Sequence, residues 1–170
     1  MIEVAASVGG EWPAEADWEV LAVGAAHAAV TQTPFGWLAD APFMAEISVK
    51  FAENDEVQAL NGAYRHKDKP TNVLSFPQIQ PDLIEALDLT DDGEVLLGDI
   101  ILARGVVESE AGEKGVSMER HATHLVVHGV LHLLGYDHEQ GEAEAEAMEA
   151  IERAALLELG IPDPYQVTEA

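Results

Sequence analysis

The 170-residue chain contains no cysteine, which excludes disulfide bonds and thiolate metal ligands and is consistent with a reducing compartment. It also lacks any apolar run near the ~20 residues that a membrane-spanning helix needs. The N-terminal residues Met1–Val4 carry no basic stretch, so we expect no signal peptide. These absences together predict a cytoplasmic protein that does not bind membranes.

Cations are scarce as well, since 8 Lys and Arg residues stand against 32 Asp and Glu residues, for a net charge of −24. This balance argues against broad nucleic-acid binding, because phosphate contacts need a cationic surface, and we expect no DNA partner. Three of the eight basic residues nevertheless fall within five positions, at Arg65, Lys67 and Lys69. This cluster is either a focused anion site or a solvated helix end, where the helix dipole favours cations.

The apolar content of 48% and the length predict one domain with a substantial core. Alternation and helical periodicity predict an α+β fold, with a mixed sheet of about four strands backed by helices. We expect the domain to span residues 1–160 and residues 161–170 to form a loose tail. The expected strands are 2–8, 45–51, 73–76 and 94–102, and the expected helices are 13–30, 103–113, 117–134 and 142–159. One further helix is expected after Asn54, which can cap it, and should end in the basic cluster at 65–69.

Three histidines, His128, His132 and His138, dominate the most informative stretch of the chain. His128 and His132 lie four residues apart on a strongly apolar helix, so they share one face. Gly135 follows the last apolar residue, where helices commonly end in a left-handed turn. The chain then reverses, and His138 can approach the same point from outside the helix.

Three neutral imidazoles in this arrangement suit one zinc ion that keeps an open position, and zinc lowers the pKa of a bound water. The alternative is a helix with packed histidines, which this spacing makes hard to sustain. His124 lies one turn before His128 and either supports the ligands, faces substrate or packs as a structural residue. The acidic face of the helix at 142–159 is interpreted as solvated surface.

The spacing of His128, His132, Gly135 and His138 also occurs in the metzincin proteases, whose helix reads H-E-x-x-H-x-x-G-x-x-H. Their glutamate, the general base for peptide hydrolysis, is replaced here by Gly129. A metallopeptidase is therefore the weaker alternative, and the missing base argues for a different substrate.

The whole stretch His124–His138 resembles the signature of the YbeY family of endoribonucleases, the bacterial rRNA maturation factors. Three further segments resemble the same family: Leu60-Asn61 with Tyr64-Arg65, Lys69–Pro77, and Leu97–Ile100. The resemblance covers roughly residues 45–140 in the correct order. Asn72 stands where the family often has Asp.

This resemblance implies a zinc-dependent endoribonuclease that acts on single-stranded RNA in rRNA processing, including the 3′ end of small-subunit rRNA, and in ribosome quality control. It implies that His128, His132 and His138 bind zinc and that Arg65 is functionally important. A guanidinium can hold two phosphate oxygens at once, which suits Arg65 to a developing phosphorane. Either His124 or Asp137 is expected to transfer a proton.

A non-catalytic ribosome-assembly factor with a structural metal is the alternative from another class. The strongly acidic surface suits basic ribosomal proteins better than bare RNA. We therefore expect the ribosome or its proteins as partners under either reading.

Overall fold

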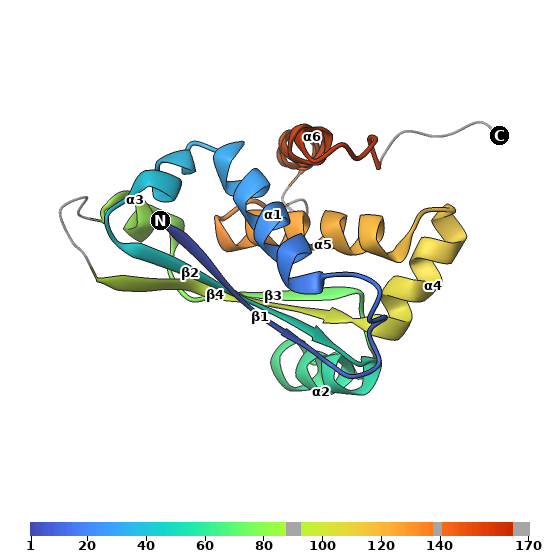
Figure 1. Cartoon of the computed structure of the whole chain (residues 1–170). Coiled ribbons are helices and arrows are strands. Elements are labelled where there is room, and N and C mark those ends of the chain that lie inside the picture. Colours follow the sequence, from blue (N-terminus) through green and yellow to red (C-terminus); the bar gives the residue numbers. More distant parts are fainter. Residues whose placement is uncertain (88–92, 138–140, 165–170) are drawn as a thin grey trace.

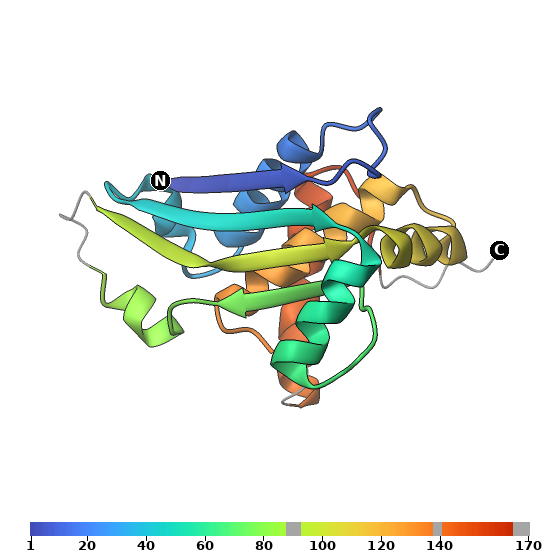
Figure 2. The same ribbon diagram turned by 90° about the horizontal axis from the view of Figure 1, so that it is seen from below.

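The computed structural model describes residues 1–87, 93–137 and 141–164. Within them, four strands form one mixed sheet in the order β1-β2-β4-β3, which confirms the predicted fold class (Figure 2). β1, β2 and β4 run parallel, and β3 pairs antiparallel with β4 at one edge. The strands are β1 (Ile2–Val8), β2 (Met44–Ala52), β3 (Val73–Pro77) and β4 (Glu94–Ala103).

Helices cover the two faces of this sheet unequally (Figure 1). α1, α5 and α6 stack over one face, which we call the upper face, and α2 lies on the opposite, lower face. The helices are α1 (Trp18–Thr31), α2 (Asn54–Arg65), α3 (Pro81–Glu85), α4 (Arg104–Lys114), α5 (Met118–Leu133) and α6 (Glu142–Glu158), with a 3-10 turn at Gly36–Asp40.

The main core lies between the upper face and α1 and α5. α1 contributes mostly alanines, whose small side chains let the helix approach the sheet closely, and α5 contributes larger aliphatic residues. At one end, Trp12 and Trp18 pack around Phe51, with the rings of Trp12 and Phe51 5.0 Å apart edge to face. Burial of this apolar area is the main stabilising contribution to the fold.

A second, smaller cluster lies on the lower face beneath α2. Its buried members are Ala52, Val57, Leu74, Ile101 and Ala103. Strand alternation explains the division, because Ile100 faces the main core while its neighbour Ile101 faces α2.

Two helix starts differ from the sequence prediction. α1 begins at Trp18 rather than near Pro13, because the carboxylate of Asp17 accepts a hydrogen bond from the backbone of Val20 and caps the helix there. α2 begins at Asn54 itself, with Glu53 in the cap position, so Asn54 does not cap this helix as predicted. Its side-chain oxygen instead accepts from the backbone N–H of Val106 in the first turn of α4, so a tertiary contact replaces the local one.

The end of the described chain packs against α6. The backbone N–H of Ile161 donates to Leu156, and Arg153 pairs with Asp163 at 3.3 Å. The tail predicted at 161–170 lies mostly outside the described residues, and the domain boundary at 160 stays a prediction. Within the described residues, no helix combines the length and apolar character needed to cross a membrane.

Candidate active site

α5 carries two of the predicted metal ligands side by side. The helix starts where the hydroxyl of Ser117 caps it by accepting from Arg120, and it ends before Gly135, whose φ of 99° is the left-handed turn that the sequence predicted. His128 and His132 lie one turn apart, and their Nε2 atoms are 3.0 Å apart. The two histidines therefore face one point, as predicted.

This pair fits a zinc ion. Two nitrogens bound to one tetrahedral zinc at about 2.0–2.1 Å lie about 3.3 Å apart, close to the separation of the two Nε2 atoms. The third predicted ligand, His138, lies outside the described residues. Within the described ranges, no three His, Asp or Glu side chains gather at metal-binding distance, so the zinc site stays a prediction that His128 and His132 support.

The structure adds a residue that the sequence did not single out, Glu152 of α6. It is fully buried, and its Oε1 lies 2.5 Å from Nδ1 of His128. With Nδ1 as the donor to this carboxylate, the neutral ring would present an unprotonated Nε2 to the site, as a metal ligand requires. The prediction that the acidic face of this helix is all solvated surface is wrong at Glu152. Its position four residues after the buried Met148 was the available signal.

His124 faces Glu152 of α6. It is buried, and its Nε2 lies 3.4 Å from Oε2 of Glu152. One turn earlier, His121 contacts Glu110 at 2.8 Å, and Glu110 also accepts from the amide of Asn72. Burial lowers the pKa of His121 below its usual 6.5, although the hydrogen bond with Glu110 opposes the shift. Proton transfer by His124 stays a prediction, and its contacts favour a supporting role.

Beside the histidine pair lies a cavity of about 570 Å³. Its lining residues come from α2, β3, α5 and the segments that follow them: Arg65, Thr71, Asn72, Val73, Ser75, Pro77, His128, His132, Gly135, Tyr136 and Asp137. Arg65 and Asp137, both singled out from the sequence, thus share a cavity with the two ligands, whereas His124 does not line it. Burial raises the pKa of Tyr136, so its phenol stays protonated and able to donate.

Arg65 reaches this cavity from the lower face, around the β3 edge of the sheet. It is the last residue of α2, and its guanidinium donates to the backbone carbonyl of Ser75 at 3.3 Å. The turn that follows Arg65 begins at His66, which takes a left-handed conformation. The buried amide of Asn61 stabilises this turn by donating to the carbonyl of Lys69. Arg65 therefore both ends a helix and lines the cavity, so its position at a helix end does not exclude the predicted anion site.

Gly129 shows why the metzincin glutamate has no counterpart here. A Cβ atom at this position would lie 3.0 Å from Cγ2 of Ile100 on β4. The face of α5 next to His128 therefore packs directly on the sheet. A longer side chain would enter the core and could not reach the cavity, which weighs against the peptidase alternative.

Fold and cavity together define an α+β protein with zincin-like histidine spacing beside an arginine suited to binding an anion. A family model described as endoribonuclease YbeY matches residues 17–160. The chain therefore belongs to the endoribonuclease YbeY family, which confirms the resemblance seen in the sequence.

Similar proteins support this membership over nearly the whole chain. An endoribonuclease YbeY from Rhizorhabdus wittichii is 62% identical over 169 residues, covering 99% of each chain. One from Sphingopyxis alaskensis is 53% identical over 165 residues, covering 97% of this chain and 98% of the other. A solution structure from Thermotoga maritima shares the fold, with a TM-score of 0.54, 23% identity and coverage of 98% of this chain and 100% of that chain.

Proposed function

We propose that this family member is a zinc-dependent endoribonuclease that cuts single-stranded RNA, and that it acts in rRNA processing, including the 3′ end of small-subunit rRNA, and in ribosome quality control. One observation carries the proposal beyond family membership. A single cavity joins His128 and His132 from the upper side of the sheet to Arg65 from the lower side. A metal-binding pair and a cation placed together suit phosphodiester chemistry.

Different residues of the chain have different roles in the proposed reaction. His128 and His132, with His138, would hold one zinc ion, and Glu152 fixes the orientation of the His128 ring. When bound, zinc would supply a Lewis acid that activates water near neutral pH. Arg65 binds the scissile phosphate and stabilises the charge that develops on its oxygens.

Asp137 is the better placed of the two proton-transfer candidates, because it lines the cavity and His124 does not. We propose that Asp137 moves a proton at the attacking or leaving oxygen, and that His124 holds Glu152 in place. The ends of the products identify the nucleophile. A 2′,3′-cyclic phosphate would show attack by the RNA 2′-hydroxyl rather than by water.

The negative charge that disfavours broad contact with RNA favours binding to basic proteins. With a net charge of −24, most of the surface attracts cationic proteins. We propose that ribosomal proteins dock on this acidic surface while RNA enters at the cavity. Association with ribosomes should then weaken as salt concentration rises.

Cleavage of a labelled single-stranded RNA by the zinc-loaded protein tests the proposal. The control is His128→Ala purified identically, which exposes contaminating ribonucleases. Cleavage by the parent alone, abolished by a chelator and restored by zinc, is the expected result. Equal cleavage by both proteins, or none by either, would refute the proposed activity and favour an assembly factor with a structural metal.

A further inference from the structure

Tyr64 is the one exposed aromatic side chain among the Phe, Trp and Tyr residues that the structure describes. It is 68% exposed, whereas the tryptophans and phenylalanines are buried or half-buried. Its ring stands edge to face over Phe76 of β3, with the ring centroids 5.5 Å apart. One side of the Tyr64 ring is thus fixed by the protein while much of the ring stays open to solvent.

The position of Tyr64 connects it to the cavity. It immediately precedes Arg65 in the last turn of α2. On β3, Phe76 faces the lower side with the α2 cluster, and its neighbours Ser75 and Pro77 line the cavity. Tyr64 and Arg65 therefore occupy the two sides of one short stretch of the β3 edge. A chain that leaves the cavity past Arg65 reaches Tyr64 next.

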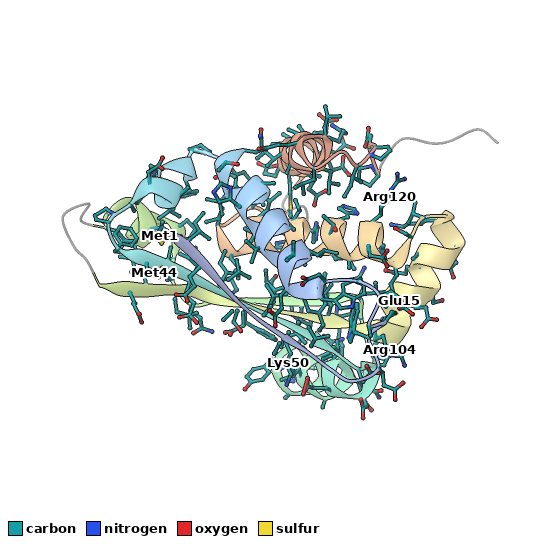
Figure 3. All side chains as sticks on the ribbon, in the orientation of Figure 1. Met1, Glu15, Met44, Lys50, Arg104 and Arg120 are labelled. Atoms are coloured by element: carbon teal, nitrogen blue, oxygen red, sulfur yellow. The ribbon has the colours of Figure 1, made fainter. Side chains whose placement is uncertain are left out.

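Charge favours an anionic chain along this route. Lys67 and Lys69 follow Arg65 and are exposed. Two other cations are paired with carboxylates: Lys50 lies 2.7 Å from Glu56, and Arg104 lies 2.7 Å from Glu53. Figure 3 shows that Arg104 lies where β4 runs into α4.

Two acids border the route, and they limit where phosphates can run. Asp68 lies between the lysines and accepts from Gln58, and Asp99 is the register partner of Phe76 on β4. Phosphates are therefore best accommodated on the Arg65 side, and an uncharged group beside Phe76.

The segment is also held in place before any ligand binds. His66 caps α2 in a left-handed conformation, the backbone N–H of Lys67 donates to the carbonyl of Asn61, and the Asn61 amide clamps the loop at Lys69. A surface held in its binding conformation loses less entropy when it binds.

We propose that Tyr64 is a nucleobase-stacking site for single-stranded RNA, next to the cavity in which the phosphodiester is cut. Arg65 holds the phosphate that links this nucleotide to the cavity, and Lys67 and Lys69 attract the strand beyond it. Aromatic side chains stack on any base, because every base has a π-face, so the site selects unpaired RNA rather than a particular sequence. The inference rests on the proposed function, since it places the substrate of the same cavity.

Two assays test this site with the full-length protein, which is zinc-loaded in the first. Cleavage kinetics on a single-stranded RNA should show that Tyr64→Ala raises KM by about 5- to 150-fold, the range for loss of one stacked base, and changes kcat much less. Tyr64→Phe should stay close to the parent, because it retains the ring. Leu157→Ala removes an equally exposed apolar side chain on α6 and should leave KM unchanged.

The second assay measures RNA binding by fluorescence anisotropy in a His128→Ala background, which removes cleavage without altering α2. A series of RNAs, each with one abasic residue, locates the stacked base. When the missing base is the one that stacks on Tyr64, the abasic RNA should bind the Tyr64-containing protein as weakly as intact RNA binds the Tyr64→Ala protein. The Tyr64→Ala protein should bind this abasic RNA and the intact RNA with equal affinity. A thermal melt confirms that each variant is folded.

The outcomes separate this inference from the proposed function. If the parent cleaves RNA and Tyr64→Ala matches it in both KM and affinity, the stacking site is refuted and the nuclease stands. If the parent binds RNA through Tyr64 but cleaves none, the stacking site stands and the proposed activity fails. If the parent neither binds nor cleaves single-stranded RNA, both are overturned.

Discussion

Among the described residues, the upper face of the sheet buries a cluster of 32 side chains beneath α1, α5 and α6, whereas the lower face buries five beneath α2. The two faces also differ in what they contribute to the cavity. The upper face supplies the histidines, on a helix that is buried along most of its length. The lower face supplies Arg65, the last residue of a helix with only two buried residues, Val57 and Asn61.

This difference suits the role that we propose for each group. Metal ligands must be held within a narrow geometry, which a packed helix with hydrogen-bonded supports provides. Residues that bind a flexible strand must be exposed, and a helix at the sheet edge places them within reach. Residues from the two faces meet around the cavity at the β3 edge.

Matched leucine truncations test the comparison most directly. Leu131 of α5 is fully buried in the upper core, and Leu74 of β3 is 2% exposed in the lower cluster. We expect Leu131→Ala to lower the free energy of unfolding by about 3–5 kcal/mol and Leu74→Ala by about 2–3 kcal/mol, because a small cluster near solvent relaxes more easily around a cavity. Urea denaturation of both variants measures the two costs. Equal losses would show that the lower cluster is packed as rigidly as the main core.

Replacing Arg65 separates activity from the metal site. Arg65→Ala should lower kcat by about 10²–10³-fold, the usual loss when one group that stabilises transition-state charge is removed. Zinc content, measured by elemental analysis, should be unchanged, because Arg65 comes from the opposite face and its recorded protein contact is with the Ser75 carbonyl. Arg65→Lys keeps the charge without the planar fork and should recover only part of the activity. A folded Arg65→Ala protein that cleaves RNA at the parent rate would remove Arg65 from the mechanism.

Glu152 provides the corresponding test on the upper face. Glu152→Gln should weaken zinc binding by about 10–100-fold, because supporting hydrogen bonds to metal ligands contribute on this scale. Competition with a chromophoric chelator measures the affinity independently of activity. Glu149→Gln, one turn earlier and paired with Arg153 at 3.9 Å, is the matched control and should bind zinc like the parent. Unchanged affinity in Glu152→Gln would make the buried carboxylate a purely structural residue.

The contrast between the faces also shows what the sequence could predict. The helical pattern that begins at Ser117, the turn at Gly135 and the spacing of the histidine pair are all local signals, and the structure confirms the helix, the turn and the shared face of the pair. Glu152 is one of six glutamates in α6, and only the packing of α6 on α5 distinguishes it. Asn54 has the local chemistry of a cap, but which helix it caps depends on how α2 meets α4. Local sequence patterns thus predicted the histidine pair on α5, whereas its contacts with α6 required the tertiary structure.

The smallest expected effect concerns His121, whose contact with Glu110 connects α5 to α4. Its pKa is lowered mainly by burial and also by Lys114 and His124, while Glu110 acts in the opposite direction. The unfolded chain therefore binds a proton here at a higher pH than the folded protein does. The free energy of unfolding should fall as the pH drops through 6.5, the usual histidine pKa, towards the lower pKa of the folded protein. Above pH 6.5 the contribution of His121 to stability should be fully present.

Urea midpoints for the parent and His121→Gln at pH 7.5 and pH 5.5 measure this contribution. The variant should lose less stability between the two pH values than the parent, even if it is less stable at pH 7.5 because Glu110 loses a partner. His27→Gln, at an exposed position of α1, controls for the removal of one imidazole. A variant with the same pH dependence as the parent would show that acid sensitivity arises elsewhere, and that His121 supports the upper face through packing and its hydrogen bond alone.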